Sequence, residues 1–462
     1  MEDKSFKGIL QDIMLREVPS YANKFFYSLG FLSMTAFMIL ILSGFVLVFN
    51  GPTWWLTDPF GVYVRSVHLW ATQAFIFFIF LHLLIVFLTS GFRLERRLTW
   101  VFGSLMLFAA LFEAEFGYGL RGDFSTQWRT LQAADLFNGS GLGLFINNLN
   151  YSQIYGIHIV LIPLIILSLL FFHYLLIRVR GIAKPFKKGT QYKMVKANHE
   201  VLFLRGLVLV GAIVVLAYFF RSPLILPNTI KDVASQDPQL MAQTLFEEYN
   251  HTSDTATYLD SIDPYKFDTR KVYIDYPYLQ YIKLTGGADM LGMFNSENIS
   301  LQNKNIKEAE NYFKNGGTPD TSVNFKNPLI SVISSLILMG KSGLYEDALR
   351  GEVQGGLNPT YVTRFISDTG VLEAKAERLK ITTDQYGMLK EETGILPPGA
   401  WWLAPVGILD NTLLANDPNQ DRDGAEILGF LLLLLIAFPY IPYLNRIPEK
   451  LSIDKFLWKS KV

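Results

Sequence analysis

Long apolar runs alternate with polar segments along the first half of the chain, and one further run stands near its end. A helix needs about 20 predominantly apolar residues to cross a bilayer. The runs that meet this length are residues 26–50, 62–90, 97–118, 150–178, 201–221 and 425–444. The pattern therefore predicts six transmembrane helices. Residues 222–424 lack such runs, and their one apolar stretch, 328–340, is too short to span and predicts a core helix of a separate domain.

Lysine and arginine gather in three segments that six spans place on one side of the membrane. These basic residues are Arg93, Arg96 and Arg97, then Arg178, Arg180, Lys184, Lys187, Lys188, Lys193 and Lys196, and finally Arg446, Lys450, Lys455, Lys459 and Lys461. By the positive-inside rule this side is cytoplasmic. Residues 222–424 are then extracytoplasmic, in a bacterial inner membrane or an equivalent energy-transducing membrane.

The run lengths and the change in composition divide the chain into five parts. They are an amphipathic cytoplasmic-side segment (1–25), a four-helix domain (26–186), a basic linker with the fifth helix (187–221), the outer domain (222–424) and the last helix with a basic tail (425–462).

Composition narrows the class of protein further. Of the 462 residues, 50% are hydrophobic and 18% are charged, and the formal net charge is zero. Such a chain is typical of a membrane protein and gives no indication of a nucleic-acid partner. It contains no cysteine, which excludes a thiolate-bound iron–sulfur cluster, a thioether-linked haem and disulfides within it.

Four of the six histidines lie inside two of the apolar runs at nearly equal spacing. His68 and His82 are fourteen residues apart, and His158 and His173 are fifteen apart. In a helix this separation is about 21 Å and about four turns. If the two helices are antiparallel, His68 meets His158 and His82 meets His173, and each pair can supply both axial nitrogens of a haem iron. The alternative is four histidines satisfied inside a bundle, but intramembrane ionisable groups at matching depth favour ligation.

Glycines repeat the histidine interval on the other two helices of the first four. Gly30 and Gly44 are fourteen residues apart, as are Gly103 and Gly117. Because glycine lets a backbone approach a macrocycle closely, these positions predict clearance for haem. Ordinary packing of small residues is the alternative. Arg65, one turn before the first histidine, is placed to pair with a haem propionate or to reach the membrane interface.

Two long strings resemble the haem helices of the cytochrome b family, and the resemblance is closer to cytochrome b6. They are RSVHLWATQAFIFFIFLHLLIVFLTSGF (65–92) and YSQIYGIHIVLIPLIILSLLFFHYLLIRVRGIAKPF (151–186). The glycines stand where that family keeps glycines, and the fifteen-residue histidine interval is the one the b6 branch uses. The resemblance covers about residues 8–186, and it brings Arg178, in the IR…G turn that ends the second string, into the set of expected cofactor-binding residues.

The resemblance implies a diheme four-helix bundle. With the two further transmembrane helices that run length predicts, and the mainly helical extracytoplasmic domain expected for residues 222–424, the fold class is an all-α membrane protein. The resemblance also implies two non-covalent haem b groups, a low-potential one between His68 and His158 on the outer side and a higher-potential one between His82 and His173 on the cytoplasmic side. The expected function is electron transfer between the quinone pool and partner redox subunits. The chain would then be one subunit of a quinol oxidoreductase.

The expected partners are a Rieske-type iron–sulfur protein, cytochrome c-type subunits, membrane lipid and a second copy of the chain within a multisubunit complex. The alternative is a diheme quinone-redox anchor with a remodelled outer quinol site, whose outer domain mainly docks partner subunits.

Departures from the family pattern bear on its further sites. Ser28 stands where cytochrome b6 proteins have the cysteine that tethers an additional haem, so a covalent haem is excluded and a further non-covalent haem stays open. Ile85 replaces the family's usual arginine near the inner haem. The segment after the third span keeps Tyr118, Asp123 and Trp128 as candidates for an outer quinone site.

The family's PEWY segment, whose glutamate is thought to accept a quinol proton, has no clean match. The nearest string is ILPPGAWWLAP (395–405), with glycine and alanine at the position of that glutamate. The sequence therefore gives no support for a working outer quinol-oxidation site of the family's usual kind.

Two further patterns are less specific. Alternating oxygen ligands in DPNQDRDG (417–424) match part of a calcium loop, or a solvated turn that begins the last helix. The candidate calcium ligands are Asp417, Asn419, Asp421 and Asp423. His199, at the cytoplasmic end of the fifth span, could handle a quinone proton or be a plain interfacial residue.

Overall fold

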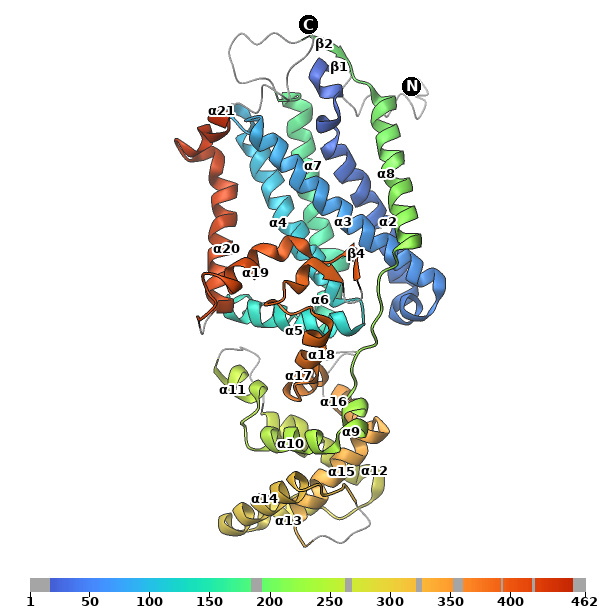
Figure 1. Cartoon of the computed structure of the whole chain (residues 1–462), viewed down its shortest axis with the longest axis vertical. Coiled ribbons are helices and arrows are strands. Elements are labelled where there is room, and N and C mark those ends of the chain that lie inside the picture. The colour runs from blue at the N-terminus through green and yellow to red at the C-terminus, as the bar shows by residue number, and fades with distance from the viewer. Residues whose placement is uncertain are drawn as a thin grey trace, which may run out of the picture.

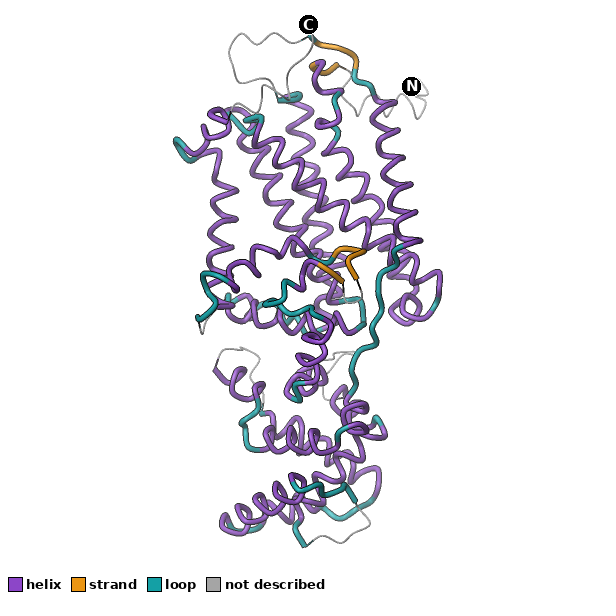
Figure 2. Tube along the Cα trace, viewed as in Figure 1, coloured by secondary structure: helices purple, strands orange, loops and turns teal. Residues whose placement is uncertain are grey.

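The chain folds into a bundle of long helices with a second, smaller helical body at one end (Figure 1). This computed structural model describes residues 17–183, 193–261, 268–320, 326–351, 360–391, 394–417 and 420–451. The amphipathic helix expected over residues 1–25 falls mostly outside these ranges. In the described part, strands occur only as two short pairs, and helices make up the rest of the regular structure (Figure 2).

The long helices are apolar enough to cross a membrane, as the sequence predicts. They are α2 (Leu29–Thr57), α3 (Pro59–Leu88), α4 (Arg97–Gly119), the continuous run of α6 (Tyr151–Gly156), η5 (Ile157–Leu161) and α7 (Ile162–Arg180), α8 (His199–Phe219) and α20 (Gln420–Ala437). Their bounds differ by only a few residues from the predicted runs, except that α2 extends seven residues further and α20 begins five and ends seven residues earlier. The chain is an all-α integral membrane protein.

The first two spans form a tight antiparallel hairpin because of the residues that join them. Gly51 has a φ of 77°, which a glycine adopts without strain, and α2 bends there before Pro52. The Asp58 carboxylate then caps α3, accepting hydrogen bonds from the backbone N–H groups of Phe60 and Gly61. The two helices pack against each other along their length.

Short elements close the bundle at its other end. Strands β1 (Glu17–Pro19) and β2 (Met194–Lys196) pair antiparallel, with Val18 opposite Val195. The brief turns η1 (Ser20–Asn23), η2 (Phe25–Tyr27) and η3 (Leu94–Arg96) lie near the same end. These contacts place the start of α2, the start of α8 and the loop between α3 and α4 on one side of the bundle.

Helix α5 (Phe124–Gly139) lies across the opposite ends of the spans and links the bundle to the outer domain (Figure 1). The Asp123 carboxylate caps it through the backbone N–H of Thr126. The turn η4 (Leu142–Leu144) follows. Phe124 and Trp128 are buried in the core of the outer domain rather than in the bundle.

The outer domain packs its helices around α15 (Pro328–Ser342), which confirms the prediction of a core helix at 328–340. Leu329, Val332, Ile333, Leu336 and Ile337 are fully buried there. The other elements are α9 (Ile230–Gln236), α10 (Pro238–Tyr249), α11 (Asp254–Ser261), η6 (Lys271–Asp275), α12 (Tyr276–Thr285), α13 (Met290–Ser296), α14 (Ile299–Lys314), α16 (Leu344–Gly351), α17 (Thr360–Asp368) and α18 (Val371–Leu379).

The chain returns to the bundle through a short hairpin that lies against the outer ends of the spans. The elements are η7 (Gly387–Leu389), β3 (Lys390–Glu391), β4 (Gly394–Pro398), η8 (Trp401–Leu403) and α19 (Ala404–Asn411). After α20 the chain ends its described part in η9 (Phe438–Tyr440), η10 (Leu444–Arg446) and α21 (Ile447–Leu451).

Candidate functional site

The imidazoles of His68 on α3 and His158 on η5 face each other inside the bundle. Their ring centroids are 6.3 Å apart. An iron bound between two imidazole nitrogens, at about 2 Å from each, would place the ring centroids roughly 6 Å apart. The spacing of this pair therefore fits a six-coordinate haem iron. At the next level, His82 on α3 and His173 on α7 lie close enough to interact electrostatically.

Three of the four imidazoles are held by a hydrogen bond at Nδ1. The nitrogen of His158 lies 3.0 Å from the backbone oxygen of Glu113, and that of His173 lies 3.0 Å from the backbone oxygen of Thr99. Since a carbonyl only accepts, Nδ1 carries the proton in both rings. This leaves Nε2 with its lone pair, which is the arrangement of a histidine ligand oriented from behind.

The hydroxyl of Ser43 on α2 orients His68 in the same way. Its oxygen lies 2.9 Å from Nδ1 of the imidazole. Because this hydroxyl already donates to the backbone oxygen of Ile39 at 2.6 Å, it accepts the hydrogen bond from the ring. Sequence reasoning missed Ser43, which lies beside Gly44 and has no motif of its own.

Glu113 on α4 places a carboxylate beside the same imidazole pair. Its Oε1 lies 3.2 Å from Nδ1 of His158, and its side chain is mostly buried. A carboxylate behind a ligating imidazole raises the basicity of the ring and tunes the metal. Sequence reasoning missed this residue, although an acidic residue inside an apolar span is itself a signal of function.

Each of the four predicted glycines lies against one of the four histidines. A Cβ atom would stand 3.4 Å from the imidazole Cε1 at Gly30 facing His82, 3.5 Å at Gly44 facing His68, 3.4 Å at Gly103 facing His173 and 3.0 Å at Gly117 facing His158. The sequence predicted that these glycines leave room for the face of the haem macrocycle. In the structure, the space beside each glycine is occupied by a histidine ring.

The fifteen-residue histidine interval is explained by a π-turn. His158 lies in η5, a single π-helical segment between α6 and α7. A π-turn holds one extra residue relative to an α-helix, and such bulges cluster at functional sites. Fifteen residues with one bulge therefore make about the same four turns as the fourteen residues between His68 and His82. The bulge brings both histidines of the fourth span onto one face.

The residues present therefore fit two stacked haem groups between α3 and the fourth span. Four imidazoles supply the donor nitrogens, three of the rings are oriented by hydrogen bonds at Nδ1, and glycines of the neighbouring helices leave room for all four rings. The two levels are separated by about 21 Å along α3.

Arg65 and Arg178, the two arginines predicted to contact the cofactors, have different surroundings. Arg65 is buried, and its Nη2 donates to the backbone oxygens of Ser222 and Pro223, both at 3.1 Å. Its Nη1 lies 3.7 Å from the carboxylate of Asp123. Arg178 is exposed in the last turn of α7. A propionate contact stays a prediction for both.

A buried polar cluster joins the end of α4 to the returning hairpin. The Tyr118 hydroxyl donates to Glu391 at 2.9 Å, and Arg121 donates to the same carboxylate at 2.7 Å. Arg121 also pairs with Asp123 at 2.8 Å. Burial alone would raise the pKa of Glu391, but the charges of Arg121 and Arg129 and the hydrogen bonds from Arg121 and Tyr118 hold that pKa below its usual value. Sequence reasoning missed Glu391, whose partners lie about 270 positions away.

The string nearest to the PEWY pattern packs against α3. Gln73 donates to the backbone oxygens of Pro398 at 2.9 Å and Gly399 at 3.1 Å, and Trp401 donates to the Gln73 side chain at 2.9 Å. A Cβ atom at Gly399 would lie 2.4 Å from the backbone oxygen of Lys390. The hairpin therefore leaves no room for any side chain at Gly399. A glutamate could stand at this position only if the backbone of the hairpin changed.

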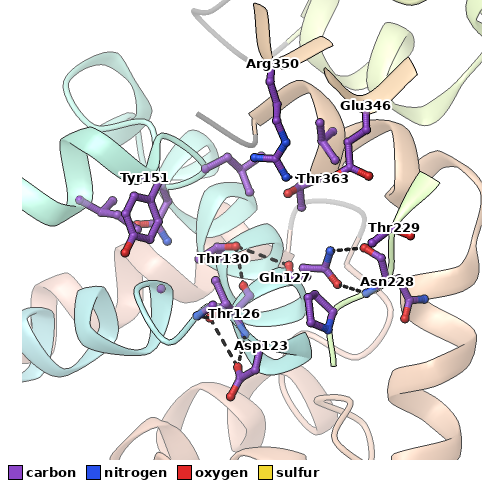
Figure 3. Close-up of a pocket in the computed structure, with 17 residues that line it drawn as sticks. Asp123, Thr126, Gln127, Thr130, Tyr151, Asn228, Thr229, Glu346, Arg350 and Thr363 are labelled. Atoms are coloured by element: carbon purple, nitrogen blue, oxygen red, sulfur yellow. Dashed lines mark hydrogen bonds and ion pairs between the residues drawn. The ribbon is translucent and has the colours of Figure 1, made fainter. Parts of the chain in front are cut away.

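The outer-site candidates from the sequence do not converge on one pocket. Asp123 lines a cavity of about 220 Å³ between α5 and the outer domain (Figure 3), whereas Tyr118 turns toward the returning hairpin. Trp128 points into the outer-domain core and donates to the backbone oxygen of Ile381 at 3.3 Å. The indole of Trp128 is part of the packing between α5 and the outer domain, and a quinone role for Tyr118, Asp123 and Trp128 stays a prediction.

Figure 3 shows polar side chains from several elements around the cavity, among apolar lining residues such as Leu149 and Ile154. Gln127 of α5 exchanges two hydrogen bonds with the backbone of Asn228, at 2.7 and 2.8 Å, across one wall. On the opposite side, Asn148 Oδ1 and Tyr151 Oη are buried without a hydrogen-bond partner among the described residues. The cavity lies on the same side of the bundle as His158.

The sequence also singled out Ser28, Ile85 and His199. The Ser28 hydroxyl donates to the backbone oxygen of Phe25 and accepts from Arg205 at 3.3 Å, and Ile85 is buried in α3. His199 begins α8 at the end opposite to the outer domain. Neither an additional haem near Ser28 nor a quinone role for His199 is tested by this geometry.

The calcium pattern meets a helix instead of a loop. Asn419 lies outside the described residues, while Asp421 and Asp423 fall within the bounds of α20. No group of three or more histidine or acidic ligands occurs among the described residues. The calcium interpretation therefore stays a prediction, and the alternative, a turn that begins the last span, agrees with the start of α20 at Gln420.

Comparison with known proteins gives relatives for the first part of the chain. The family described as "Cytochrome b(N-terminal)/b6/petB" matches residues 73–232. Cytochrome b6 of Heliobacterium modesticaldum is 33% identical over 199 residues, which is 38% of this chain and 93% of that protein. Cytochrome b6 of Gracilaria tenuistipitata is 28% identical over 206 residues, 40% of this chain and 95% of that protein. A solved structure titled "Hyperthermophilic respiratory Complex III" aligns over 81% of this chain and 95% of its own, with a TM-score of 0.41 and 16% identity.

Proposed function

Because the chain belongs to the cytochrome b family, near its b6 branch, we propose that it is a membrane electron carrier with two haem b groups. His68 and His158 would hold the outer haem, and His82 and His173 the inner haem. One observation carries the proposal: the paired imidazoles, 6.3 Å apart at the outer level, are backed by glycines and oriented through Nδ1.

When bound, the haems supply reversible one-electron redox centres. The residues of the chain do the rest. The four imidazoles would hold the irons, Ser43 and the backbone oxygens of Glu113 and Thr99 fix the orientation of three of the rings, and the apolar helices would exclude water from both levels. The separation of about 21 Å between levels moves charge across most of a bilayer, whose hydrocarbon core is about 30 Å thick.

We propose the quinone pool as the source or acceptor of the electrons, and a multisubunit quinol oxidoreductase as the setting. The named relatives are cytochrome b6 proteins, which supports this class of complex. Partners of the Rieske or cytochrome c type, and a second copy of the chain, belong to the same proposal. The side that carries residues 222–424 would be extracytoplasmic, as the distribution of basic residues indicates.

The direct test is a potentiometric titration of the purified protein with visible spectroscopy. Two b-type components with separate midpoint potentials are expected, and a soluble quinol should reduce at least one of them. His158→Leu should abolish one component and leave the other, and His82→Leu should do the reverse. A protein with no reducible b-type absorbance would refute the proposal. A protein whose spectrum survives all four histidine substitutions would do the same.

A second candidate is favoured by the returning hairpin: a diheme quinone-redox anchor with a remodelled outer quinol site. Gly399 has no room for a side chain, and both carboxylate oxygens of Glu391 are already hydrogen-bonded. Among the described residues of the hairpin, which leave out positions 392 and 393, no carboxylate is therefore free to take a quinol proton. In this version the outer domain mainly docks partner subunits.

Inhibitor sensitivity separates the two candidates. An outer-site inhibitor of the stigmatellin type should block reduction of the outer haem if the usual site works. If the site is remodelled, reduction should proceed unchanged in the presence of that inhibitor. In that case a protein lacking the outer domain should keep both haems while losing its partner subunits.

A further inference from the structure

A cationic pocket lies at the end of the bundle opposite to the outer domain. Its volume is about 450 Å³, and it stands between the loop that joins α3 to α4 and the segment that follows α20. Arg93, Arg97 and Arg446 line it together with Tyr440 and Tyr443. Figure 1 shows the neighbouring helix α21 close to the ends of α3 and α4. Neither the haem sites nor the outer domain accounts for this pocket.

The three arginines carry more charge than their surroundings neutralise. Arg93 forms an ion pair with Glu449 of α21. Among the residues that the structure describes, no carboxylate lies within 4.0 Å of the guanidinium nitrogens of Arg97 or Arg446. Burial, followed by repulsion from Arg446 and Arg97, lowers the pKa of Arg93. Counted over the described residues, the pocket therefore has a net positive charge of about two and more cations than anions.

Arg97, which lines the pocket, has a buried donor group without an acceptor among the described residues. Its guanidinium carbon lies 5.3 Å from the centre of the Tyr440 ring, and its Nε is buried with no hydrogen-bond partner among the described residues. A buried donor without an acceptor is costly, so a bound anion would remove a penalty that the chain alone leaves in place.

The position of the pocket at the ends of the spans favours a lipid as the source of the bound anion. It is at the ends of three spans, since α3 ends at Leu88, α4 begins at Arg97 and the last span ends at Tyr440. Tyr440 and Tyr443 are 51% and 84% exposed, as is usual for tyrosines at the level of lipid headgroups. Directly below, α20 exposes Phe430 and Leu433 to the bilayer. An anion with acyl chains therefore fits better than a soluble one.

We propose that this pocket binds the phosphate group of an anionic phospholipid, with its acyl chains along α20. Arginine suits this ligand because its planar guanidinium can donate two parallel hydrogen bonds to phosphate oxygens. Basic pockets between transmembrane helices on the cytoplasmic side are suited to such headgroups. The bound lipid would hold α20 and α21 against the α3–α4 loop. This contact lies at the end of the bundle that carries the proposed inner haem.

Native mass spectrometry of the full-length protein, stripped of lipid in detergent, tests the site. The probes are phosphatidylglycerol, phosphatidylcholine and inorganic phosphate, each added to the wild type and to Arg97→Gln and Arg446→Gln. Arg97→Lys keeps the charge but loses the two-pronged geometry. Lys193→Gln is the matched control, since it removes one positive charge from an exposed side chain at the same end of the bundle, outside the pocket.

The wild type and Lys193→Gln should each retain one tightly bound phosphatidylglycerol. Its apparent affinity should fall roughly tenfold or more in the two glutamine variants, and less in Arg97→Lys, as expected when one charge-assisted hydrogen bond is lost. Unchanged visible spectra would show that the variants fold. Equal binding of phosphatidylcholine, binding unaffected by both glutamine variants, or saturation by inorganic phosphate alone would each overturn the proposal.

Discussion

Replacing Glu113 with glutamine should raise the midpoint potential of the outer haem. Glu113 Oε1 lies 3.2 Å from Nδ1 of His158, on the side of the ring away from the proposed iron. A negative charge there stabilises the ferric form, so its removal favours reduction. Glutamine has nearly the same shape, and the backbone oxygen that holds the ring is unchanged.

The size of the shift follows from the distance. An iron at Nε2 of His158 lies about 4 Å beyond Nδ1, so the carboxylate and the iron are roughly 7 Å apart. At an effective dielectric constant of about 20, two unit charges at this distance interact by about 2 kcal/mol. For a one-electron couple this corresponds to a shift of about 100 mV. The inner iron is about three times farther away, so its shift should be about a third as large.

Potentiometric titration of the wild type and Glu113→Gln, followed in the haem absorption bands, measures both shifts. Glu115→Gln is the matched control. It removes the same charge from the same helix, but this side chain interacts with Arg129 rather than with His158. Equal shifts of both haems, or equal shifts in the two variants, would refute the assigned role of Glu113.

Three further predictions test other contacts. Gly117→Val should displace the His158 ring, since even a Cβ would stand 3.0 Å from it, and difference spectra should then show loss of the outer haem with the inner haem retained. Glu391→Ala should lower stability by up to about 3–5 kcal/mol, because it removes one of the two carboxylates that pair with the buried Arg121 and the acceptor of the Tyr118 hydroxyl; an unchanged melting temperature would contradict this. Burial, followed by the hydrogen bond and the charge of Asp368, raises the pKa of Glu248 above 4.5 in the folded state. The folded protein therefore keeps a proton that the unfolded chain releases, so stability should fall as the pH rises above about 5. Glu248→Gln should melt like the wild type at pH 5 and at a higher temperature at pH 8, with a gain of at most about 1.4 kcal/mol per pH unit; equal melting at pH 8 would count against the assignment.

The transmembrane part could be predicted closely because its signals are local. Run length alone placed the spans, and the two histidine intervals placed the paired levels. The match between Gly117 and His158 also follows from spacing, although the sequence could not show that the glycine faces the ring rather than the macrocycle. The π-turn at His158 was not visible, because a bulge has no propensity signature of its own.

The outer side could not be predicted because its contacts join distant parts of the chain. Glu391 meets Arg121 across 270 positions, and the missing space at Gly399 depends on how Lys390 folds back. Trp128 is a candidate quinone-site residue because of its place after the third span. The sequence could not show that its indole packs in a domain whose sequence begins about 100 residues later.

Haem content per chain in the single histidine variants tests the central claim most directly. A pyridine haemochrome assay on quantified protein should give two haem b groups for the wild type and one each for His68→Leu and His173→Leu. The double variant should contain none. A wild type with fewer than two haems, or single variants that keep both, would contradict the assignment of the four histidines as axial ligands.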